Sequence, residues 1–200
     1  MKNNLLDESV SLGDLDREIK RRKRASERHK LYRTIISSII VVAAVAVLIA
    51  TLWFPVMSVN GTSMEPIMND GDIIVAVKDI RLIERGDIIA FYYNDKVLLK
   101  RVIGLPGDTV NMDDQGNVFV NGELVKEPYI SKKSLGICDV QFPVTVDENS
   151  VFVLGDHRSV SVDSRSKDVG NIFNERIIGK IVWQVYPFTK LGAFDSKSMA

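Results

Sequence analysis

The stretch IISSIIVVAAVAVLIATLWF, from Ile35 to Phe54, decides how this chain is organised. It carries no charged side chain, and at about 1.5 Å of helical rise per residue it can cross a hydrocarbon core of about 30 Å. A cleavable signal peptide would have an apolar run of about 7–15 residues followed by a small-residue cleavage site. The stretch is longer than that, and Pro55-Val56-Met57-Ser58 makes a poor cleavage site. We therefore expect an uncleaved transmembrane helix over residues 35–54.

The residues before this helix are rich in basic side chains, with a dense block at Lys20-Arg21-Arg22-Lys23-Arg24. Such a block can bind nucleic acid, but beside an apolar run it is typical of the cytoplasmic flank of a membrane helix. We predict that residues 1–34 are cytoplasmic and that the chain after residue 54 is extracytoplasmic, in a single-pass cell-membrane protein. Leu12–Tyr32 can be a charged helix or disordered. The formal net charge is zero, which gives no argument for nucleic-acid binding from overall charge. We therefore expect the lipid bilayer as a partner, through the apolar stretch, and no nucleic acid.

After residue 54 the pattern changes to short β-prone runs separated by Gly-Asp turns. Asn121-Gly122 stands between two such runs and is a strong hairpin signal. No long run of helical period follows the apolar stretch, so we predict a mainly β, antiparallel domain over residues 56–195, barrel-like or folded over in two sheets. The expected strands are Ile73–Val77, Ile88–Tyr93, Val97–Ile103, Val118–Val120, Leu124–Val125, Val151–Leu154 and Ile177–Val185.

Metal and disulfide chemistry have little support in this sequence. Cys138 is the only cysteine, so no intrachain disulfide can form and no cysteine cluster can bind zinc. His29 and His157 are the only histidines, too few for a histidine-based metal site of the usual three or four ligands. We expect no cofactor and no metal.

Ser63 and Lys100 are the candidate reactive pair. Ser63 lies in Gly61-Thr62-Ser63-Met64-Glu65-Pro66, shortly after the apolar stretch, and Lys100 lies in a predicted strand. A serine hydroxyl is a weak nucleophile until a base removes its proton, and a lysine is such a base only when its amine is neutral. Burial lowers the pKa of a lysine, and in a strand Leu98 and Val102 flank Lys100 on its own face. Alone, each residue has an ordinary reading, as a turn serine and a solvent-facing lysine.

A third polar stretch runs from Gly155 to Arg165 as GDHRSVSVDSR. Its plain interpretation is a turn in which Asp163 and Arg165 form a structural ion pair. Such a pair could hold Ser161 in place, and Ser161 could orient the amine of Lys100, a supporting role that precise sites need.

These stretches, in their order along the chain, resemble the bacterial type I signal peptidases, membrane serine endopeptidases that remove signal peptides from exported preproteins. The resemblance covers roughly Ile35 to Phe188, and the form is that of the short Gram-positive members. The matching segments are Ser63-Met64-Glu65-Pro66, Arg85-Gly86-Asp87-Ile88-Ile89, Lys100 to Asp108, Gly155 to Arg165, and Ile178-Gly179-Lys180-Ile181-Val182-Trp183.

The resemblance implies a nucleophile at Ser63 and a general base at Lys100, in an extracytoplasmic β-fold that needs no metal. Ser161, Asp163 and Arg165 would support the lysine, and Asp156 would brace the same turn. The backbone amide of Ser63 would donate to the oxyanion. The family often adds a serine hydroxyl two residues before the nucleophile, but this chain has Gly61 there.

Substrate recognition in this reading uses an extended segment with small residues at positions −1 and −3, which adds as a strand beside a free sheet edge. Four apolar residues flank the matching motifs and are candidates for the pocket walls, although each could equally be an ordinary core residue. They are Val59, Met64, Leu98 and Leu99.

Two departures from the family pattern leave the substrate range open. Ile67 stands where a small polar residue is usual, and His157 stands where asparagine is usual. A specialised peptidase for pilins or other dedicated cargo is therefore an alternative, as is a non-catalytic assembly or chaperone protein on the same scaffold. A soluble Ser–Lys self-cleaving regulator fits poorly with the apolar stretch. His157 also permits a Ser–His site oriented by Asp163, although Lys100 already fills the role of base.

Overall fold

The computed structural model describes residues 12–194, so the ends of the predicted leader and of the predicted β domain lie outside it. The chain separates into two compact units that meet between Ala50 and Thr51. Helix α1 (Leu12–Trp53) contains both the basic residues and the apolar stretch. Of the two alternatives for Leu12–Tyr32, the helix is the one that forms. The helix ends two residues before Pro55, which cannot continue it.

The apolar part of α1 is the one helix in the described part of the chain that is long and apolar enough to cross a membrane. Its apolar side chains are exposed along the whole run. A helix that keeps such residues out of any protein core needs an apolar surrounding, which a bilayer provides.

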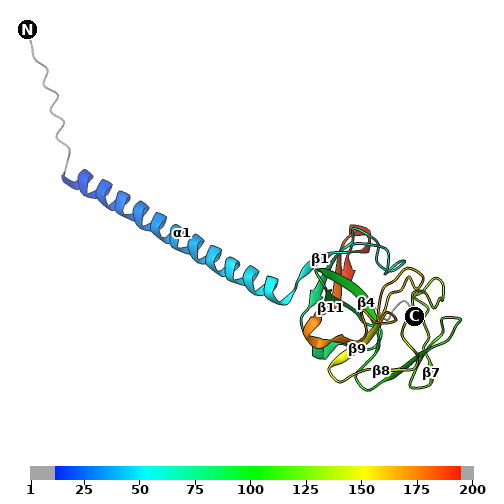
Figure 1. Cartoon of the computed structure of the whole chain (residues 1–200). Coiled ribbons are helices and arrows are strands. Elements are labelled where there is room, and N and C mark those ends of the chain that lie inside the picture. The colour runs from blue at the N-terminus through cyan, green and yellow to red at the C-terminus, as the bar shows by residue number, and fades with distance from the viewer. Residues whose placement is uncertain (1–11, 195–200) are drawn as a thin grey trace, which may run out of the picture. The chain divides into compact units, whose positions relative to one another are not determined.

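The β domain is mainly β and entirely antiparallel, as the sequence predicts, and it consists of two sheets (Figure 1). The large sheet has the order β1-β2-β11-β3-β4-β9-β10, and β12 also pairs with β11. Its strands are β1 (Val56–Ser58), β2 (Ile73–Val77), β3 (Ile88–Tyr93), β4 (Lys96–Gly104), β9 (Ser150–Leu154), β10 (Ile172–Phe173), β11 (Ile177–Tyr186) and β12 (Gly192–Ala193).

The small sheet has the order β7-β6-β5-β8. Its strands are β5 (Thr109–Met112), β6 (Val118–Val120), β7 (Glu123–Leu124) and β8 (Val144–Thr145). The predicted hairpin at Asn121-Gly122 joins β6 to β7, and both residues have the positive φ that a type I′ turn requires. Short 3-10 turns at Ile80–Leu82, Asn174–Arg176 and Phe188–Lys190 complete the described structure.

Strand β4 is the element that positions the site. It pairs with β3 from Lys96 to Arg101, but with β9 only from Arg101 onward. Along residues 96–100, therefore, no strand among residues 12–194 covers the second edge of β4. Val97 is exposed, but from Leu99 onward the apolar residues on both faces of β4 are buried, so the uncovered edge leads into a well-packed sheet.

Ile67, one of the two departures from the family pattern, is part of the core between the large sheet and the segment after β1. It is 4% exposed and packs in the same cluster as Met64 and Leu99. An apolar residue at this position is thus explained by packing in the interior.

Candidate active site

The side chains of Ser63 and Lys100 meet in the structure, although they are 37 positions apart in the sequence. The amine of Lys100 donates a hydrogen bond of 2.7 Å to the hydroxyl of Ser63. Ser63 lies in the loop between β1 and β2, and Lys100 lies on β4 just before that strand begins to pair with β9. Backbone hydrogen bonds from Val59 to Asp72 and from Gly71 to Val59 close this loop. Residues 59–72 are called the nucleophile loop below, after the role that the family resemblance implies for Ser63.

Burial shapes the acidity of the Lys100 amine. The residue is 2% exposed, and this desolvation lowers its pKa from 10.5 to about 8. The nearby carboxylates of Asp163 and Asp156 act against the shift, because they favour the charged amine, and the guanidinium of Arg165 acts with it. A lysine with a pKa of about 8 is partly neutral near pH 7, so it can accept a proton from the hydroxyl it contacts.

The segment from Gly155 to Arg165 packs directly against the nucleophile loop. The backbone N–H of His157 donates to the carbonyl of Ser63 at 3.0 Å. Gly155 lies so close that a Cβ there would be 2.7 Å from the Ser63 carbonyl oxygen and 2.1 Å from the Ser161 hydroxyl oxygen. Only glycine therefore allows these two serines to approach, a requirement that the sequence pattern alone did not indicate.

Ser161, which the sequence suggests could orient the amine of Lys100, is fully buried beside this contact. Its hydroxyl oxygen has no hydrogen-bond partner among the described residues. Its backbone is nevertheless fixed, since its N–H donates to the carbonyl of His157 at 3.2 Å. Its predicted role in orienting the lysine stays a prediction.

The ion pair between Asp163 and Arg165 is present and completely buried. Two guanidinium nitrogens of Arg165 each donate to the carboxylate at 2.8 Å, and the backbone N–H of Gly155 donates to it at 2.9 Å. Arg165 also donates to the carbonyls of Leu135 and Arg158. The pair thereby ties the irregular loop of residues 131–143 to the segment beside Ser63.

Asp156 braces the same segment from the sheet. Its carboxylate accepts from two nitrogens of Arg101, at 2.8 and 2.7 Å, and both residues are buried. Burial raises the pKa of Asp156, and the hydrogen bond from Arg101 opposes this rise. Lys100 thus faces Ser63, while its neighbour Arg101, on the opposite face of β4, holds the adjoining loop through Asp156.

Sequence reasoning missed a second buried pair, Arg158 with Glu127. The guanidinium of Arg158 donates to both carboxylate oxygens of Glu127 and, through Nε, to the carbonyl of Gly155 at 3.1 Å. The hydroxyl of Tyr129 donates a hydrogen bond of 3.0 Å to Glu127. The guanidinium of Arg101 lies over the ring of Tyr129, 3.9 Å from its centroid. No local sequence pattern identifies Glu127, because its partner is 31 positions away.

The oxyanion donors can be compared directly at this site. The N–H of Ser63 has no acceptor within the part of the chain that the structure describes. The N–H of Gly61, by contrast, donates to the carboxylate of Asp70 at 2.7 Å. Of the two positions considered from the sequence, only Ser63 has a backbone donor available for a developing negative charge.

The structure gives the Ser–His alternative no geometric basis. His157 directs Nδ1 to the carbonyl of Thr62 at 3.2 Å, and the carboxylate of Asp163 is occupied by Arg165 and Gly155. Asp163 therefore does not orient His157, and the hydroxyl of Ser63 contacts Lys100.

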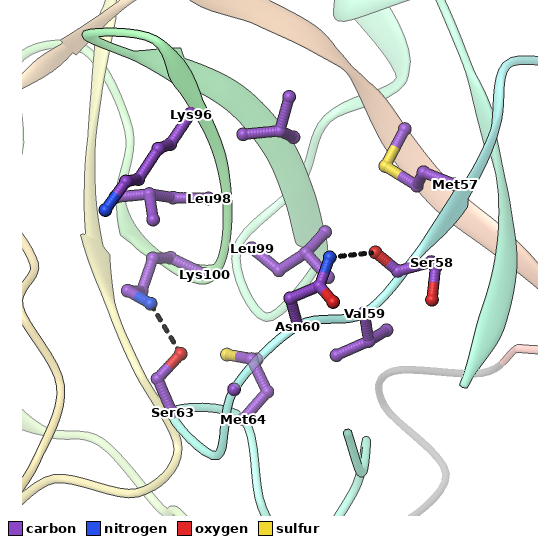
Figure 2. A pocket seen from close by; sticks show the side chains of 12 residues that line it. Met57, Ser58, Val59, Asn60, Ser63, Met64, Lys96, Leu98, Leu99 and Lys100 are labelled. Atoms are coloured by element: carbon purple, nitrogen blue, oxygen red, sulfur yellow. Dashed lines mark hydrogen bonds between the residues drawn. The ribbon is translucent and has the colours of Figure 1, made fainter. Parts of the chain in front are cut away.

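A groove of about 630 Å³ opens beside the reactive pair (Figure 2). One wall is the segment of β1 and the nucleophile loop, and the other is the uncovered edge of β4. The four predicted pocket residues all line it: Val59 and Met64 on the first wall, Leu98 and Leu99 on the second. Val59, Met64 and Leu99 also belong to the core, so the groove floor is rigid. The sequence did not single out Met57, Ser58, Asn60, Lys96 and Val97, which complete the lining.

Within residues 12–194 the side chains show no cluster of His, Cys, Asp or Glu that could hold a metal ion. Cys138 is half-buried in the loop, where its thiol lies 3.7 Å from the carbonyl of Val140. The chemistry that the site offers is that of a hydroxyl, an amine and a backbone amide.

Comparison with known proteins gives matches along most of the chain. The family model described as signal peptidase, peptidase S26, matches residues 32–186. A signal peptidase I of Bacillus licheniformis is 35% identical over 86% of this chain and 98% of its own length. Signal peptidase I T of Bacillus subtilis is 34% identical over 84% of this chain and 93% of its own length. A solved signal peptidase I from Enterococcus faecalis is 31% identical, with a TM-score of 0.41, over 51% of this chain and 98% of that one.

The two sequence relatives are each covered over nearly their whole length, and the family match includes the nucleophile loop, β4 and the Gly155–Arg165 segment. The resemblance found in the sequence motifs is thereby confirmed, and the chain belongs to the signal peptidase family, peptidase S26.

Proposed function

We propose that Ser63 and Lys100 carry out the cleavage by which this signal peptidase removes signal peptides from exported preproteins. The observation that carries the proposal is the 2.7 Å hydrogen bond between the Lys100 amine and the Ser63 hydroxyl, made by a lysine that is almost completely buried. A hydroxyl in contact with a base whose pKa is about 8 is the arrangement that nucleophilic catalysis by serine requires.

In the proposed mechanism the neutral amine of Lys100 takes the proton of the Ser63 hydroxyl as the oxygen attacks the scissile carbonyl carbon. The Ser63 N–H stabilises the negative oxygen of the tetrahedral intermediate. The Lys100 ammonium then gives its proton to the departing amine, and the peptide bond breaks to leave an ester on Ser63. The same amine then takes a proton from water, which attacks the ester carbonyl, and the ammonium gives that proton to the departing Ser63 oxygen, so the signal peptide leaves with a free carboxylate.

The uncovered edge of β4 is the surface on which we propose that the substrate binds. In an antiparallel ladder, alternate residues direct their N–H and C=O groups away from the partner strand. The backbone groups of Val102 bond to residues 86 and 87, so those of Arg101 face β9, where Arg101 pairs with Leu154. Leu99 and Val97, two and four residues earlier, therefore present their N–H and C=O groups at the same edge, where β9 does not pair with them. An extended preprotein segment can pair with them and place alternate side chains against the groove walls.

The small side chains preferred at −1 and −3 follow from the walls of this groove. Leu99 and Met64 are core residues held by their neighbours, so they cannot move aside for a bulky substrate side chain. In the main alternative, a peptidase for a dedicated preprotein, the cleavage chemistry is the same and the groove accepts a narrower range of substrate side chains.

For the location of the chain, we propose a single membrane-spanning helix with a cytoplasmic N-terminus and an extracytoplasmic β domain. The basic block within α1 and the apolar stretch that follows it support this topology by the positive-inside rule. The lipid bilayer is then a partner of α1, and nucleic acid is not. A cysteine placed at Ser159, labelled by a membrane-impermeant thiol reagent on intact cells in a Cys138→Ala background, tests the orientation; labelling only after lysis would refute it.

The function is tested with purified full-length protein in detergent or lipid and a preprotein that has an Ala-x-Ala site. We expect a single cut after that site, abolished in Ser63→Ala and in Lys100→Met. Ser159→Ala, an exposed serine of the 155–165 segment, is the matched control and should cleave normally. Cleavage that persists in Ser63→Ala would refute the proposed nucleophile, and a cut only in selected preproteins would identify dedicated cargo.

A further inference from the structure

His157 makes hydrogen bonds to the carbonyls on both sides of the nucleophile's α-carbon. Its ring nitrogen Nδ1 lies 3.2 Å from the carbonyl oxygen of Thr62. Its backbone N–H donates to the carbonyl of Ser63 at 3.0 Å. One residue therefore fixes the two peptide planes between which the side chain of Ser63 emerges.

The ring must act as the donor in the first of these contacts. A backbone carbonyl only accepts hydrogen bonds, so the contact with Thr62 requires the hydrogen to be on Nδ1. The carboxylate of Glu65 lies 3.8 Å from the same nitrogen, and its negative charge favours a hydrogen there. The Thr62 carbonyl also accepts from the backbone N–H of Glu65 at 3.2 Å, so it is held by two donors.

The geometry of the peptide bond connects this contact to the oxyanion site. In a trans peptide the C=O of Thr62 and the N–H of Ser63 point in opposite directions within one plane. A donor that holds the carbonyl on one side therefore fixes the direction of the N–H on the other. Hydrogen bonds in such a chain also polarise one another, so donation to the carbonyl strengthens the N–H as a donor.

This N–H has no substitute among the groups considered for the oxyanion. Gly61 has no side-chain donor, and its own N–H is held by Asp70 at 2.7 Å. An oxyanion that depends on the Ser63 N–H is sensitive to its alignment, since removing one donor of this kind lowers the rate by about 10²–10³.

We propose that His157 is a positioning residue for the oxyanion: its imidazole holds and polarises the Thr62–Ser63 peptide so that the Ser63 N–H faces the developing negative charge. The inference rests on the proposed function, because it assumes that Ser63 is the nucleophile. His157 acts through the peptide and does not exchange a proton with the substrate.

The test compares substitutions of similar size that differ in their ability to donate. In His157→Asn the side-chain amide can replace Nδ1 as donor, whereas His157→Leu has about the same volume and no donor. His157→Ala removes the donor without adding an apolar group. His157 is only partly buried, and its backbone contact to Ser63 remains in every variant, so all three should fold. Ser159→Ala is the control on the same segment.

With the preprotein substrate, we expect kcat to fall about tenfold in His157→Leu and His157→Ala, a part of the loss expected for a whole donor. The KM should stay within about twofold, because the Thr62–Ser63 peptide matters in the transition state more than in substrate binding. His157→Asn should stay within about threefold of the unsubstituted protein. If His157 acted only through its size and packing, asparagine, which keeps only the hydrogen-bond donor, would not restore kcat.

A peptide boronic acid provides a second readout that does not depend on turnover. It forms a tetrahedral adduct with the nucleophile, and one of its oxygens occupies the oxyanion position. Its inhibition constant should rise in His157→Leu by the same factor as kcat/KM falls. The same peptide with a reduced scissile bond has no oxygen there, so its affinity should not change.

Equal kcat in His157→Leu and the unsubstituted protein would overturn the inference, as would a loss in His157→Asn as large as in His157→Leu or a loss confined to KM. These outcomes are separable from failure of the proposed function, which would appear as cleavage by Ser63→Ala.

Discussion

Gly155 lies against Ser161 so closely that a Cβ atom on the glycine would be 2.1 Å from the serine hydroxyl oxygen and 2.5 Å from its Cβ. The same atom would be 2.7 Å from the carbonyl of Ser63. All three neighbours are part of the site or its support, and none is the flexible end of a long side chain. The approach of the Gly155–Arg165 segment to the nucleophile loop therefore depends on the absence of a side chain at one position.

Gly155→Ala is expected to remove most of the peptidase activity. The added methyl group must push the Ser63 loop away from β4, and overpacking of this kind costs about 1–3 kcal/mol of stability. A displacement of the nucleophile lowers catalysis more than stability, since near-attack geometry tolerates little misplacement. Preprotein cleavage and thermal unfolding of the same samples check both effects. Gly192→Ala is the matched control, because its Cβ would meet no atom within 4 Å.

The rate of cleavage should depend on pH through Lys100. Burial lowers the pKa of this amine to about 8, and only its neutral form can act as base. Below pH 8 the neutral fraction falls tenfold per unit, so kcat/KM should rise with pH at low pH and level off above about 8. Measured on a preprotein between pH 5.5 and 10, as assay conditions, a profile that is flat through pH 8 would contradict Lys100 as the base.

Asp163→Asn should move this profile toward lower pH. The carboxylate of Asp163 favours the charged amine of Lys100, so its removal lowers the pKa of the lysine further. The substitution also leaves Arg165 without its buried partner, which costs about 3–5 kcal/mol of stability. Profiles should therefore be recorded well below the unfolding temperature of the variant. A shift toward higher pH would contradict the assigned electrostatic contribution.

Glu127→Ala is expected to destabilise the β domain strongly. It removes the carboxylate that accepts from the buried guanidinium of Arg158 and from the hydroxyl of Tyr129, and leaves the charge of Arg158 unpaired. Removing one member of a buried ion pair costs about 3–5 kcal/mol, whereas replacing both by apolar residues is often neutral. The double variant Glu127→Leu with Arg158→Met should therefore recover much of the stability lost in the single variant. Urea unfolding of the detergent-solubilised full-length protein measures both, and equal stability of the two variants would contradict the coupling.

Leu99→Ala should broaden the substrate range. Leu99 is 8% exposed and lines the groove, so its truncation opens space for larger side chains at −1 or −3. We expect peptides with leucine at one of these positions to be cleaved at least tenfold better than by the unsubstituted protein, a difference of about 1.4 kcal/mol. The control is Ile172→Ala, a buried truncation on β10 outside the groove, which should lower stability without changing the preference. An unchanged side-chain preference in Leu99→Ala would contradict a role of Leu99 in limiting the substrate side chain at −1 or −3.

Much of the sheet could be predicted from the sequence, because its longer strands carry a strong local pattern. Ile73–Val77, Ile88–Tyr93 and Val118–Val120 occur with the predicted bounds, and the Val97–Ile103 strand is one residue longer at each end. The strand predicted at Leu124–Val125 is shifted by one residue, to Glu123–Leu124. Strands β1, β5, β8, β10 and β12 were not predicted, since runs of two to four residues are defined by their pairing partners more than by composition.

The family and the two side chains that meet, Ser63 and Lys100, could be predicted because their motifs are local, whereas most of the buried partners around them could not. Arginines are rarely expected in a core, yet Arg101, Arg158 and Arg165 are all fully buried. Asp156 lies 55 positions from Arg101, and Glu127 lies 31 from Arg158. A single sequence does not reveal such distant partners. The one pair predicted, Asp163 with Arg165, is separated by only two positions.

The adjacency of Lys100 and Arg101 on β4 makes the register of this strand a condition for chemistry as well as for folding. A slip of a single residue against β3 would turn every side chain of β4 to the opposite face. The permanently charged guanidinium would then lie against Ser63, and the amine would lie against Asp156. Such a misfolded form would retain nearly all its backbone hydrogen bonds, but the amine of Lys100 would no longer contact Ser63. The correct register of β4 during folding is therefore a prerequisite for an active enzyme, beyond the mere formation of the sheet.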